Sequence, residues 1–279
     1  MSKQRDRYAV IGHPIEHSRS PHIHTVFAEQ TGQALTYERL PAAPDAFVAT
    51  VDRFFADGGA GLNVTLPFKA EAAAHADALT ERAARAGAVN TLMRRADGSL
   101  LGDNTDGIGL LRDLGAHLAA VEGARILILG AGGAVRGVVP ILLGQAPATL
   151  CVANRTAARA QAIAADFSDL GPVTGCGLAE LEPGWDIVIN AISAGLSGDM
   201  PDIPAVVLDN GPAAYDMIYA ETATPFLRWA AEQGVARRRD GFGMLVEQAA
   251  ESFHLWRGVR PRTDDVIARL RPGGARHAP

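Results

Sequence analysis

Cysteine and long apolar runs are scarce in this chain of 279 residues. The only two cysteines, Cys151 and Cys176, are too few for a disulfide framework and lack metal-ligand spacing. We therefore expect a reducing, cytoplasmic setting and no metal site. The apolar run that ends at Gly12 is too short for a signal-peptide core, and no apolar stretch approaches the length that spans a bilayer. We expect neither a signal peptide nor a membrane segment.

Basic residues are also few. The chain carries 26 Lys and Arg against 31 Asp and Glu, a net charge of −5, and its only dense basic run is the three arginines at 237–239. Such a chain offers little attraction to nucleic acid or to an anionic membrane. The 48% of hydrophobic residues suffices for a sizeable core, and the length allows two domains. A soluble protein that acts on small molecules fits this composition.

The first hundred residues predict a mixed sheet with helices. Ser20 is expected to cap a helix whose first residue is Pro21, and Pro67 is expected to open another that holds Lys69 in its first turn. Asp97-Gly98 between two extended runs is a hairpin signal. Periodicity predicts strands at 8–11, 36–40, 62–66, 89–95 and 99–104, and helices at 20–31 and 46–56.

Strands and helices alternate in the rest of the chain, which is typical of a doubly wound nucleotide-binding domain. The helix at 105–118 is expected to link the two parts. The other expected strands are 125–129, 149–153, 186–191, 206–209 and 215–218, and the other helices are 134–143, 157–167, 225–233 and 241–256. The predicted fold class is α/β with two domains, a mixed-sheet domain and a Rossmann domain.

A glycine-rich turn, Gly130-Ala131-Gly132-Gly133-Ala134, lies between a predicted strand and a predicted helix. Glycines there let the backbone approach a pyrophosphate, and the helix N-terminus supplies amides and positive potential. Alone, such a turn could merely connect two elements. Its place in a strand–helix–strand unit favours a dinucleotide site.

The second strand of that unit indicates the cofactor. An acidic residue there would hold the ribose hydroxyl of NAD, but this chain has Asn154-Arg155-Thr156, with Arg159 one turn later. Guanidinium groups can bind a 2′-phosphate, which a carboxylate would repel. These arginines could also be ordinary solvated charges. The missing acid and the paired arginines together favour NADP.

A second group of polar residues lies outside this domain. Ser18 and Ser20 offer hydroxyls to a carboxylate at a helix start, unless Ser20 is only a cap. Asn63 and Thr65 share one strand face, and Lys69 follows them, although a lone lysine is more often a solvated surface residue.

The remaining polar candidates come from three other segments. Asn90 adds an amide to an apolar strand. Asp103 and Asp106 stand at a helix start, where one can cap the helix and the other is free for chemistry. Gln248 lies off the apolar stripe of its helix and could be plain surface. Taken together, these groups are what a polyhydroxylated ring acid would require.

At these residues the chain resembles the shikimate dehydrogenase family over nearly its whole length. The matching segments, in order, are YAVIGHPIEHSRSP (8–21), GLNVTLPFK (61–69), AGAVNT (86–91), GDNTDG (102–107), GAGGAVR (130–136), NRT (154–156), YDMIY (215–219) and DGFGMLVEQ (240–248). The resemblance implies NADPH-dependent, reversible reduction of 3-dehydroshikimate to shikimate, in chorismate and aromatic amino acid biosynthesis. It implies a substrate-binding domain formed by residues 1–104 plus 241–271, an NADP-binding Rossmann domain at 105–240, and a frayed tail at 272–279.

The resemblance also implies site roles. Lys69 and Asp106 would form the catalytic pair. The substrate would be held by Ser18, Ser20, Thr65, Asn90, Asp106 and Gln248. The cofactor would be lined by Gly130, Ala131, Gly132, Gly133, Ala134, Asn154, Arg155, Thr156, Arg159, Met217 and Gly241.

The chain departs from the family pattern in two places. His13 stands where Asn usually precedes Pro, and Ile192 stands where Thr usually follows Asn-Ala, near the expected nicotinamide end. Rival functions are a relative that uses quinate or aminoshikimate, a methylenetetrahydrofolate dehydrogenase, and a nucleotide-responsive binding module without turnover. The sequence does not reveal the oligomeric state, and a homodimer is compatible with it.

Overall fold

The structure, a computed structural model, describes residues 5–192 and 202–271, so the predicted frayed tail lies outside the described residues. The chain forms two compact units, Met1–Asp106 with Val246–Leu270, and Gly107–Leu245 with Arg271–Pro279. These limits fall a few residues later than the predicted 104/105 and 240/241. One reason is that Met244 belongs to the core of the second unit, so that residues 241–245 are counted with it.

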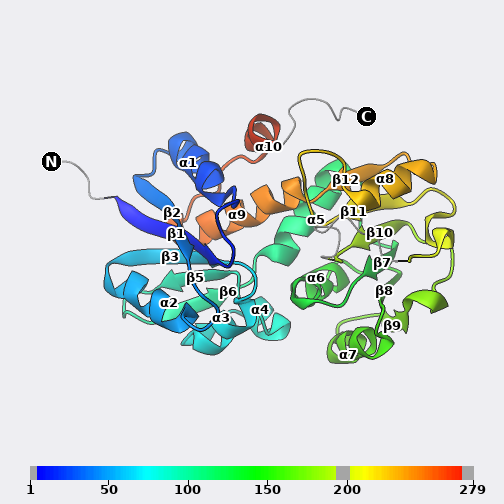
Figure 1. Cartoon of the computed structure of the whole chain (residues 1–279), viewed down its shortest axis with the longest axis horizontal. Helices are drawn as coiled ribbons and strands as arrows, with labels where there is room; N and C mark the ends of the chain where they lie inside the picture. Colours follow the sequence, from blue (N-terminus) through cyan, green and yellow to red (C-terminus); the bar gives the residue numbers. More distant parts are fainter. Residues whose placement is uncertain (1–4, 193–201, 272–279) are drawn as a thin grey trace. The chain divides into compact units, whose positions relative to one another are not determined.

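The first unit contains a mixed, six-stranded sheet, as predicted (Figure 1). Its strand order is β2-β1-β3-β5-β6-β4. β1 is parallel to β2 and β3, β4 is parallel to β6, and β5 is antiparallel to β3 and β6. The bounds are β1 (Asp6–Gly12), β2 (Leu35–Pro41), β3 (Gly59–Val64), β4 (Ala78–Leu79), β5 (Thr91–Arg94) and β6 (Leu100–Asp103).

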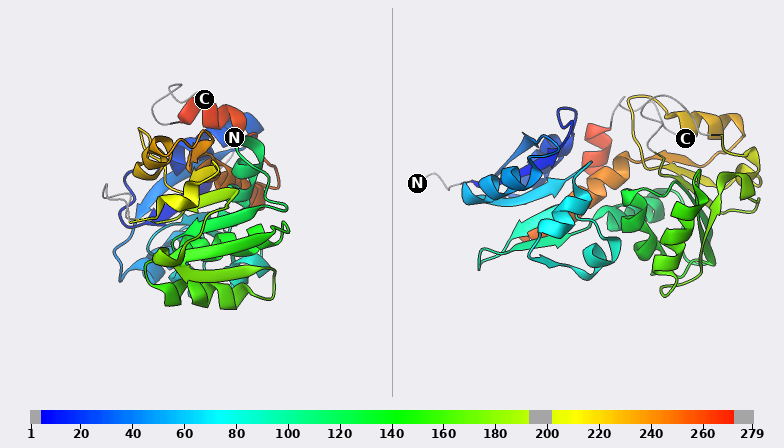
Figure 2. Two further views of the ribbon diagram at one scale, coloured as in Figure 1. Left: turned by 90° about the vertical axis from the view of Figure 1, so that its right-hand side faces the viewer. Right: turned by 60° about the horizontal axis from the view of Figure 1, so that its bottom comes forward.

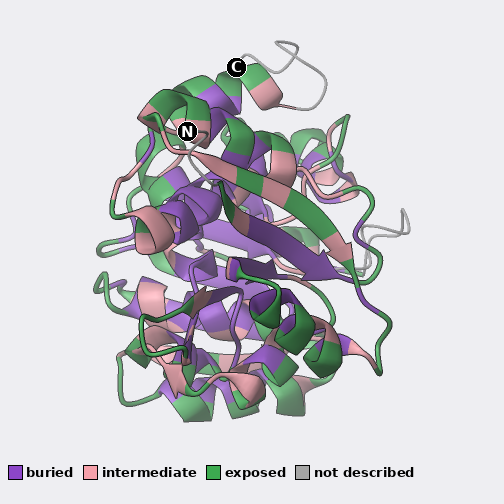
Figure 3. Cartoon of the chain, turned by 90° about the vertical axis from the view of Figure 1, so that its left-hand side faces the viewer, coloured by how far each residue is buried: buried purple, intermediate pink, exposed green. Residues whose placement is uncertain are grey.

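Burial in this sheet follows strand position. β2 is an edge strand and alternates between half-buried and exposed residues, whereas β1 beside it is mostly buried (Figure 3). One face of the sheet packs on α2 and α3 through Phe47, Phe54 and Phe68. The helices that belong wholly to this unit are α1 (Ser20–Thr31), α2 (Phe47–Ala56), α3 (Lys69–His75), α4 (Glu81–Ala86) and α10 (Asp264–Leu270).

Two details of the predicted helix starts are wrong. The N-cap of α1 is Arg19, without a side-chain cap, and Ser20 is the first helical residue. Pro67 does not open a helix, because it lies in the turn at 66–68 and α3 begins at Lys69. Lys69 is nevertheless in the first turn of α3, as its first residue.

The second unit contains a parallel sheet of strand order β12-β11-β10-β7-β8-β9, which confirms the doubly wound prediction (Figure 2). Alternate residues of β7 enter different cores, since Ile126 packs with α6 and α7 whereas Leu127 packs with α8. The elements are β7 (Arg125–Leu129), α6 (Gly133–Leu143), β8 (Thr149–Asn154), α7 (Ala157–Phe167), β9 (Val173–Gly177), η1 (Leu178–Glu180), β10 (Ile187–Asn190), η3 (Ala205–Leu208), β11 (Ala213–Asp216), α8 (Pro225–Glu232) and β12 (Arg238–Asp240). Two further helices, α5 (Asp106–His117) and α9 (Phe242–Arg257), contribute residues to both units.

For this sheet, one predicted strand is wrong and two observed strands were missed. The predicted strand at 206–209 is the 3₁₀ turn η3, because a short apolar run has no period that separates a strand from a buried helical turn. Strands β9 and β12 were not predicted. Their sequences, VTGCG and RRD, lack apolar alternation, and only pairing with β8 and β11 makes them strands.

Candidate active site

Lys69 and Asp106 form an ion pair in the first unit, with 2.5 Å between Nζ and Oδ2. Each is the first residue of its helix, α3 and α5 respectively. Phe68, fully packed in the core, anchors the chain immediately before the lysine. The two side chains are 18% and 9% exposed, so the pair is mostly shielded from water but remains accessible to solvent. A shielded ion pair of this kind holds the ammonium in one place.

Asn90 completes the surroundings of Asp106. Its Nδ2 donates to Asp106 Oδ1 at 2.8 Å, so each carboxylate oxygen of Asp106 has its own donor. The amide orientation of Asn90 is set from the other side, because its Oδ1 accepts from the Thr105 backbone N–H at 2.9 Å. The structure therefore brings together the predicted catalytic pair and one predicted substrate ligand.

Asp103 has a different role from Asp106. Burial opposes its ionisation, but hydrogen bonds from Arg82 and Thr80 lower the pKa of Asp103 below its usual value. Among the described residues, neither aspartate side chain accepts a backbone N–H of α5, and Asn104 Oδ1 accepts the Asp106 backbone N–H at 3.1 Å. The prediction that one carboxylate caps the helix is wrong, whereas Asp106 has its carboxylate available for Lys69.

Gln248 is not a surface residue. It is 9% exposed, and its Oε1 accepts from Asn90 Nδ2 at 3.3 Å and from Thr105 Oγ1 at 3.4 Å. Helix α9 thus delivers an amide to the same cluster as Asn90 and Asp106, from a position far along the chain.

Ser18 and Ser20 lie together at the start of α1. Ser18 Oγ donates to Ser20 Oγ at 3.3 Å, and Arg39 donates twice to the backbone carbonyl of Ser18. Thr65 lies just after β3, and its methyl group is so close to Gly12 that a Cβ there would lie 2.5 Å from it. Among the described residues, the Thr65 hydroxyl has no hydrogen bond with the other predicted substrate ligands.

Four polar residues that the predicted site omits join these groups: Tyr37, Asn63, Thr91 and Ser252. Asn63 Nδ2 donates to Thr91 Oγ1 at 3.2 Å and to Ser252 Oγ at 3.0 Å, and Asn63 Oδ1 accepts from Tyr37 at 2.7 Å. The polar strand face that contains Asn63 was a usable signal in the sequence. Tyr37 and Ser252 gave none, because each stands among residues of ordinary strand or helix pattern.

The glycine turn of the second unit leaves open space at the start of α6. Gly130 has φ +113°, and a Cβ there would lie 3.1 Å from the Ala191 backbone. Gly132 is the N-cap of α6, and Cβ atoms on Gly132 or Gly133 would meet no atom within 4 Å. Internal packing therefore explains Gly130 but not the other two glycines. Open space at a helix N-terminus, flanked by Ala131 and Ala134, fits a dinucleotide pyrophosphate.

The end of β8 carries the residues expected to select the cofactor. Asn154 Nδ2 donates to the Thr156 carbonyl at 3.0 Å, which bends the chain into α7. Arg155 and Arg159 are both exposed, and neither forms an ion pair with another residue in the described ranges 5–192 and 202–271. This end of β8 therefore has two guanidinium groups and no carboxylate of its own.

Met217 and Gly241 meet within the second unit. A Cβ on Gly241 would lie 2.3 Å from the Met217 carbonyl oxygen, so only glycine fits there. Asp216, just before, accepts from Asn190 Nδ2 at 3.0 Å, and burial raises the pKa of this aspartate. Asn190 Oδ1 accepts the backbone N–H of Ile192 at 3.2 Å, which places this departure from the family pattern beside the glycine turn.

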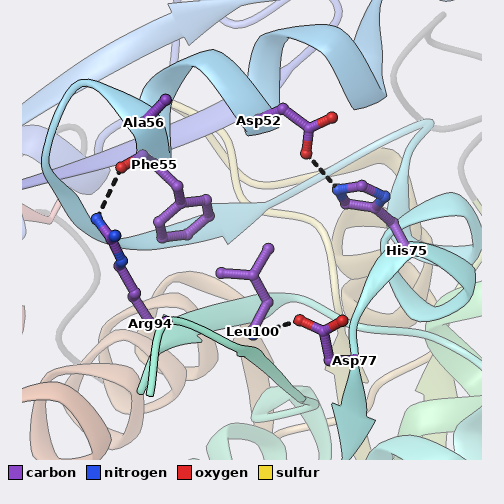
Figure 4. Close-up of a pocket in the computed structure, with 8 residues that line it drawn as sticks. Asp52, Phe55, Ala56, His75, Asp77, Arg94 and Leu100 are labelled. Atoms are coloured by element: carbon purple, nitrogen blue, oxygen red, sulfur yellow. Dashed lines mark hydrogen bonds and ion pairs between the residues drawn. The ribbon is translucent and has the colours of Figure 1, made fainter. Parts of the chain in front are cut away.

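A separate cavity of about 330 Å³ in the first unit contains none of the predicted site residues (Figure 4). Its polar groups join neighbouring elements, since His75 pairs with Asp52 at 2.8 Å and Arg94 donates to the Phe55 carbonyl at 2.9 Å. We assign it no role in the site.

Neither a membrane-spanning helix nor a metal-binding cluster is present among the described residues. No helix there has both the length and the apolar character needed to cross a membrane. No group of three or more His, Cys, Asp or Glu side chains in the same residues is arranged to hold a metal ion.

Comparison with known proteins identifies the family of this chain. Residues 10–92 match the family described as shikimate dehydrogenase substrate binding domain, residues 114–197 match shikimate / quinate 5-dehydrogenase, and residues 241–271 match the shikimate 5′-dehydrogenase C-terminal domain. A protein of Alkalilimnicola ehrlichii named shikimate dehydrogenase (NADP(+)) is 56% identical over 96% of this chain and 99% of its own length.

The chain belongs to the shikimate dehydrogenase family. Two solved structures illustrate the shared fold. An Ael1 enzyme from Pseudomonas putida is 47% identical, with a TM-score of 0.89 over 95% of this chain and 98% of that one. The shikimate 5-dehydrogenase of Thermus thermophilus, solved with NADP(H) and shikimate, is 34% identical, with a TM-score of 0.82 over 92% of this chain and 95% of that one. The α/β fold predicted from the sequence is therefore that of the family.

Proposed function

We propose that this protein catalyses the NADPH-dependent, reversible reduction of 3-dehydroshikimate to shikimate, a step of chorismate and aromatic amino acid biosynthesis. The observation that carries the proposal is the cluster of Lys69, Asp106, Asn90 and Gln248, joined by hydrogen bonds in the unit that matches the family's substrate-binding domain. The relative from A. ehrlichii is named for the same activity with NADP(+).

The chemistry needs a cation and a proton donor at the substrate's ring oxygen. When bound, the nicotinamide supplies or accepts the hydride at the ring carbon. As the ketone is reduced, negative charge develops on its oxygen, and the Lys69 ammonium stabilises that charge and donates a proton from Nζ. In the opposite direction the neutral amine accepts the proton of the alcohol. Asp106 keeps Nζ in place through its 2.5 Å contact and accepts a hydrogen bond from a ring hydroxyl.

The remaining predicted residues bind and orient the substrate. Ser18 and Ser20 donate to the carboxylate at the start of α1, where the helix dipole favours an anion. Asn90, Gln248 and Thr65 bind the ring hydroxyls. Amides serve this purpose well because each can donate and accept at the same time.

The second unit would hold NADP. The glycine turn from Gly130 to Ala134 would bind the pyrophosphate, and the 2′-phosphate would lie at Asn154, Arg155, Thr156 and Arg159. Met217 and Gly241 would line the nicotinamide end. The proposal includes a cytoplasmic location, and it is compatible with a monomer or a homodimer, which sedimentation equilibrium distinguishes.

A steady-state screen of shikimate, quinate and aminoshikimate, each with NADP and NAD, tests the proposal. Shikimate with NADP should give the highest kcat/KM. A preference for quinate or aminoshikimate would change the substrate but keep the reaction class. Binding of NADP without turnover of any of the three would contradict the proposal and favour the nucleotide-responsive module.

A further inference from the structure

Asp216 is a buried carboxylate of the second unit that the proposed mechanism does not use. It is the last residue of β11 and is 1% exposed. Its donors are neutral groups. Oδ1 accepts from Asn190 Nδ2 at 3.0 Å and from the Ile218 backbone N–H at 3.1 Å, and Oδ2 accepts from Thr224 Oγ1 at 2.5 Å. No ion pair between residues in the ranges 5–192 and 202–271 includes it. Burial without a cationic partner costs free energy, and it raises the pKa of Asp216.

One oxygen of this carboxylate joins the segments that follow β10 and β11. Asn190 is the last residue of β10 and the register partner of Asp216. While Asn190 Nδ2 donates to Asp216 Oδ1, Asn190 Oδ1 accepts the Ile192 N–H at 3.2 Å. The Asn190 carbonyl also accepts the Met217 N–H at 2.9 Å. Because Oδ1 accepts the Ile218 N–H as well, the backbone on each side is fixed relative to the same oxygen.

Both segments lie at the edge of the sheet where doubly wound folds bind their ligands. They follow the carboxyl ends of two parallel strands, and ligands of such sheets bind just beyond those ends. The segment after β10 packs on the glycine turn, since a Cβ on Gly130 would lie 3.1 Å from the Ala191 backbone. The segment after β11 is held from its other side, because the Gly241 N–H donates to the Ile218 carbonyl at 3.1 Å. A shift of either segment would therefore change the surface offered to a dinucleotide.

We propose that Asp216 is a positioning residue for the nicotinamide half of NADP, a role that rests on the proposed function. It acts through the backbone around Ile192 and Met217, which it orders before the cofactor arrives, so that binding does not have to order these segments. Thr224 fixes the carboxylate from the other side, because it is the N-cap of α8 and is 2% exposed. The hydrogen bonds of Asp216 do not extend to Arg155, which follows β8. The adenosine half of the cofactor should therefore bind without this network.

Asp216→Ala and Asp216→Asn, compared by calorimetry, test the proposal. Alanine removes both oxygens and should raise the Kd for NADP by about 10-fold, as for a lost buried hydrogen bond. Asparagine keeps Oδ1, and its amide can donate to the Thr224 hydroxyl, so the Kd should stay within about 3-fold of the wild-type value. If Asp216→Asn bound NADP as weakly as Asp216→Ala, the charge of the side chain would be what matters, and the positioning role would be wrong.

Tyr215→Phe is the matched control. Tyr215 precedes Asp216 in β11 and is fully buried, and its hydroxyl donates to Asp113 Oδ2 at 2.7 Å. The variant therefore removes a buried hydrogen bond from the same strand and leaves the segments after β10 and β11 untouched. Its Kd for NADP should equal that of wild type. An equal loss of NADP affinity in Tyr215→Phe and Asp216→Ala would reduce Asp216 to a structural role.

Adenosine 2′,5′-bisphosphate, which is the part of NADP without the nicotinamide half, separates positioning from a general loss of structure. In Asp216→Ala its Kd should stay within about 2-fold of the wild-type value, because its 2′-phosphate lies at the arginines after β8 in the proposed function. The loss of affinity would then be confined to the nicotinamide half. Equal weakening of NADP and of this fragment would overturn the inference.

Asn190→Ala covers the case in which Asp216→Ala does not fold. It removes the donor to Asp216 Oδ1 and the acceptor of the Ile192 N–H but leaves the other donors of the carboxylate in place. It should weaken NADP binding and spare the fragment in the same way, and an unchanged Kd for NADP would overturn the inference. A wild-type protein that binds neither NADP nor the fragment would instead contradict the proposed function. Wild-type binding of both, with an unchanged Kd for NADP in Asp216→Ala, would contradict this inference alone.

Discussion

His24 shows how much a single buried side chain can affect the behaviour of the first unit. Burial lowers the pKa of His24 to about 3, since a charged imidazole would be surrounded by the rings of Tyr37, Phe27, Phe253 and Trp256. An unfolded histidine titrates near 6.5, so below that pH the unfolded chain binds a proton that the folded one refuses. The contribution of neutral His24 to the free energy of unfolding is therefore present above pH 6.5 and is lost as the pH falls toward 3.

Between pH 6.5 and pH 5 this one residue should cost about 2 kcal/mol of unfolding free energy, at about 1.4 kcal/mol per pH unit. Urea unfolding of wild type and of His24→Phe at the two pH values measures this fall in unfolding free energy. The variant lacks the imidazole, so its unfolding free energy should fall less than that of wild type. His254→Gln is the control, since His254 is exposed on α9 and should leave the wild-type pH dependence intact. An equal pH dependence in wild type and His24→Phe would mean that the folded protein tolerates the charge.

Lys69 is the second single residue with a large expected effect, because the proposed proton transfer depends on it. It is one of only two lysines in the chain, the other being Lys3. Lys69→Met keeps the length of the side chain and removes the charge, and it should lower kcat by about 10²–10⁴-fold, the usual effect of losing a positioned acid or base. Shikimate affinity should fall much less, because the serines and amides remain.

Stopped-flow or steady-state assays of Lys69→Met, Lys69→Ala and the control Lys3→Met measure this. Equally slow Lys69→Met and Lys69→Ala would indicate that charge or proton transfer is what matters. Turnover of Lys69→Met close to wild type would show that the lysine only packs, and the assignment of the pair would be wrong.

At the scale of elements, parallel pairing gathers the residues proposed to bind the cofactor. Strands β7, β8, β10 and β11 are in parallel register, so their carboxyl ends meet at one edge of the sheet. Gly130 follows β7, Arg155 follows β8, and Met217 follows β11. Sequence positions almost ninety residues apart thus reach one binding edge, as expected for a doubly wound sheet.

Arg155→Ala tests the end of β8. Loss of a charge-assisted phosphate contact should raise the KM for NADP by about 10-fold or more and leave the KM for NAD nearly unchanged. Arg237→Ala, which removes another exposed arginine of the same unit, should affect neither. Equal losses with NADP and NAD would show that Arg155 does not read the 2′-phosphate.

At the scale of the whole molecule, each unit has a core of its own. The first unit packs around Phe47, Phe54 and Leu62, and the second has separate clusters on the two faces of its parallel sheet. Ligands that bind only the folded state of one unit should therefore protect that unit first.

Hydrogen exchange followed by mass spectrometry tests this. NADP at about 100 times its Kd should stabilise the second unit by about 2.7 kcal/mol and slow exchange mainly within 107–245, whereas shikimate should slow exchange mainly within 5–106 and 246–270. NAD at the same concentration as NADP is the control and should protect less. If NADP alone protected both units equally, the expectation that each ligand stabilises only its own unit would be wrong.

The sequence by itself determined most of the elements and the chemical character of the proposed sites. The period of two in β2, the glycine turn before α6 and the arginines after β8 are local patterns, and each acts within one or two elements. The residue types at Lys69, Asp106 and the two serines likewise indicated which chemistry the proposed site can perform, because side-chain type is read directly from the sequence.

Only the tertiary structure decided which of these groups meet. Asn90 and Gln248 are 158 residues apart, and Ser252 reaches Asn63 across 189 residues, so no local period could reveal either contact. For the same reason Gln248 looked like a surface residue, and Tyr37 like an ordinary strand tyrosine. Contacts between distant residues depend on strand order and helix packing. These decide which residues are neighbours in space, and local sequence patterns do not reveal them.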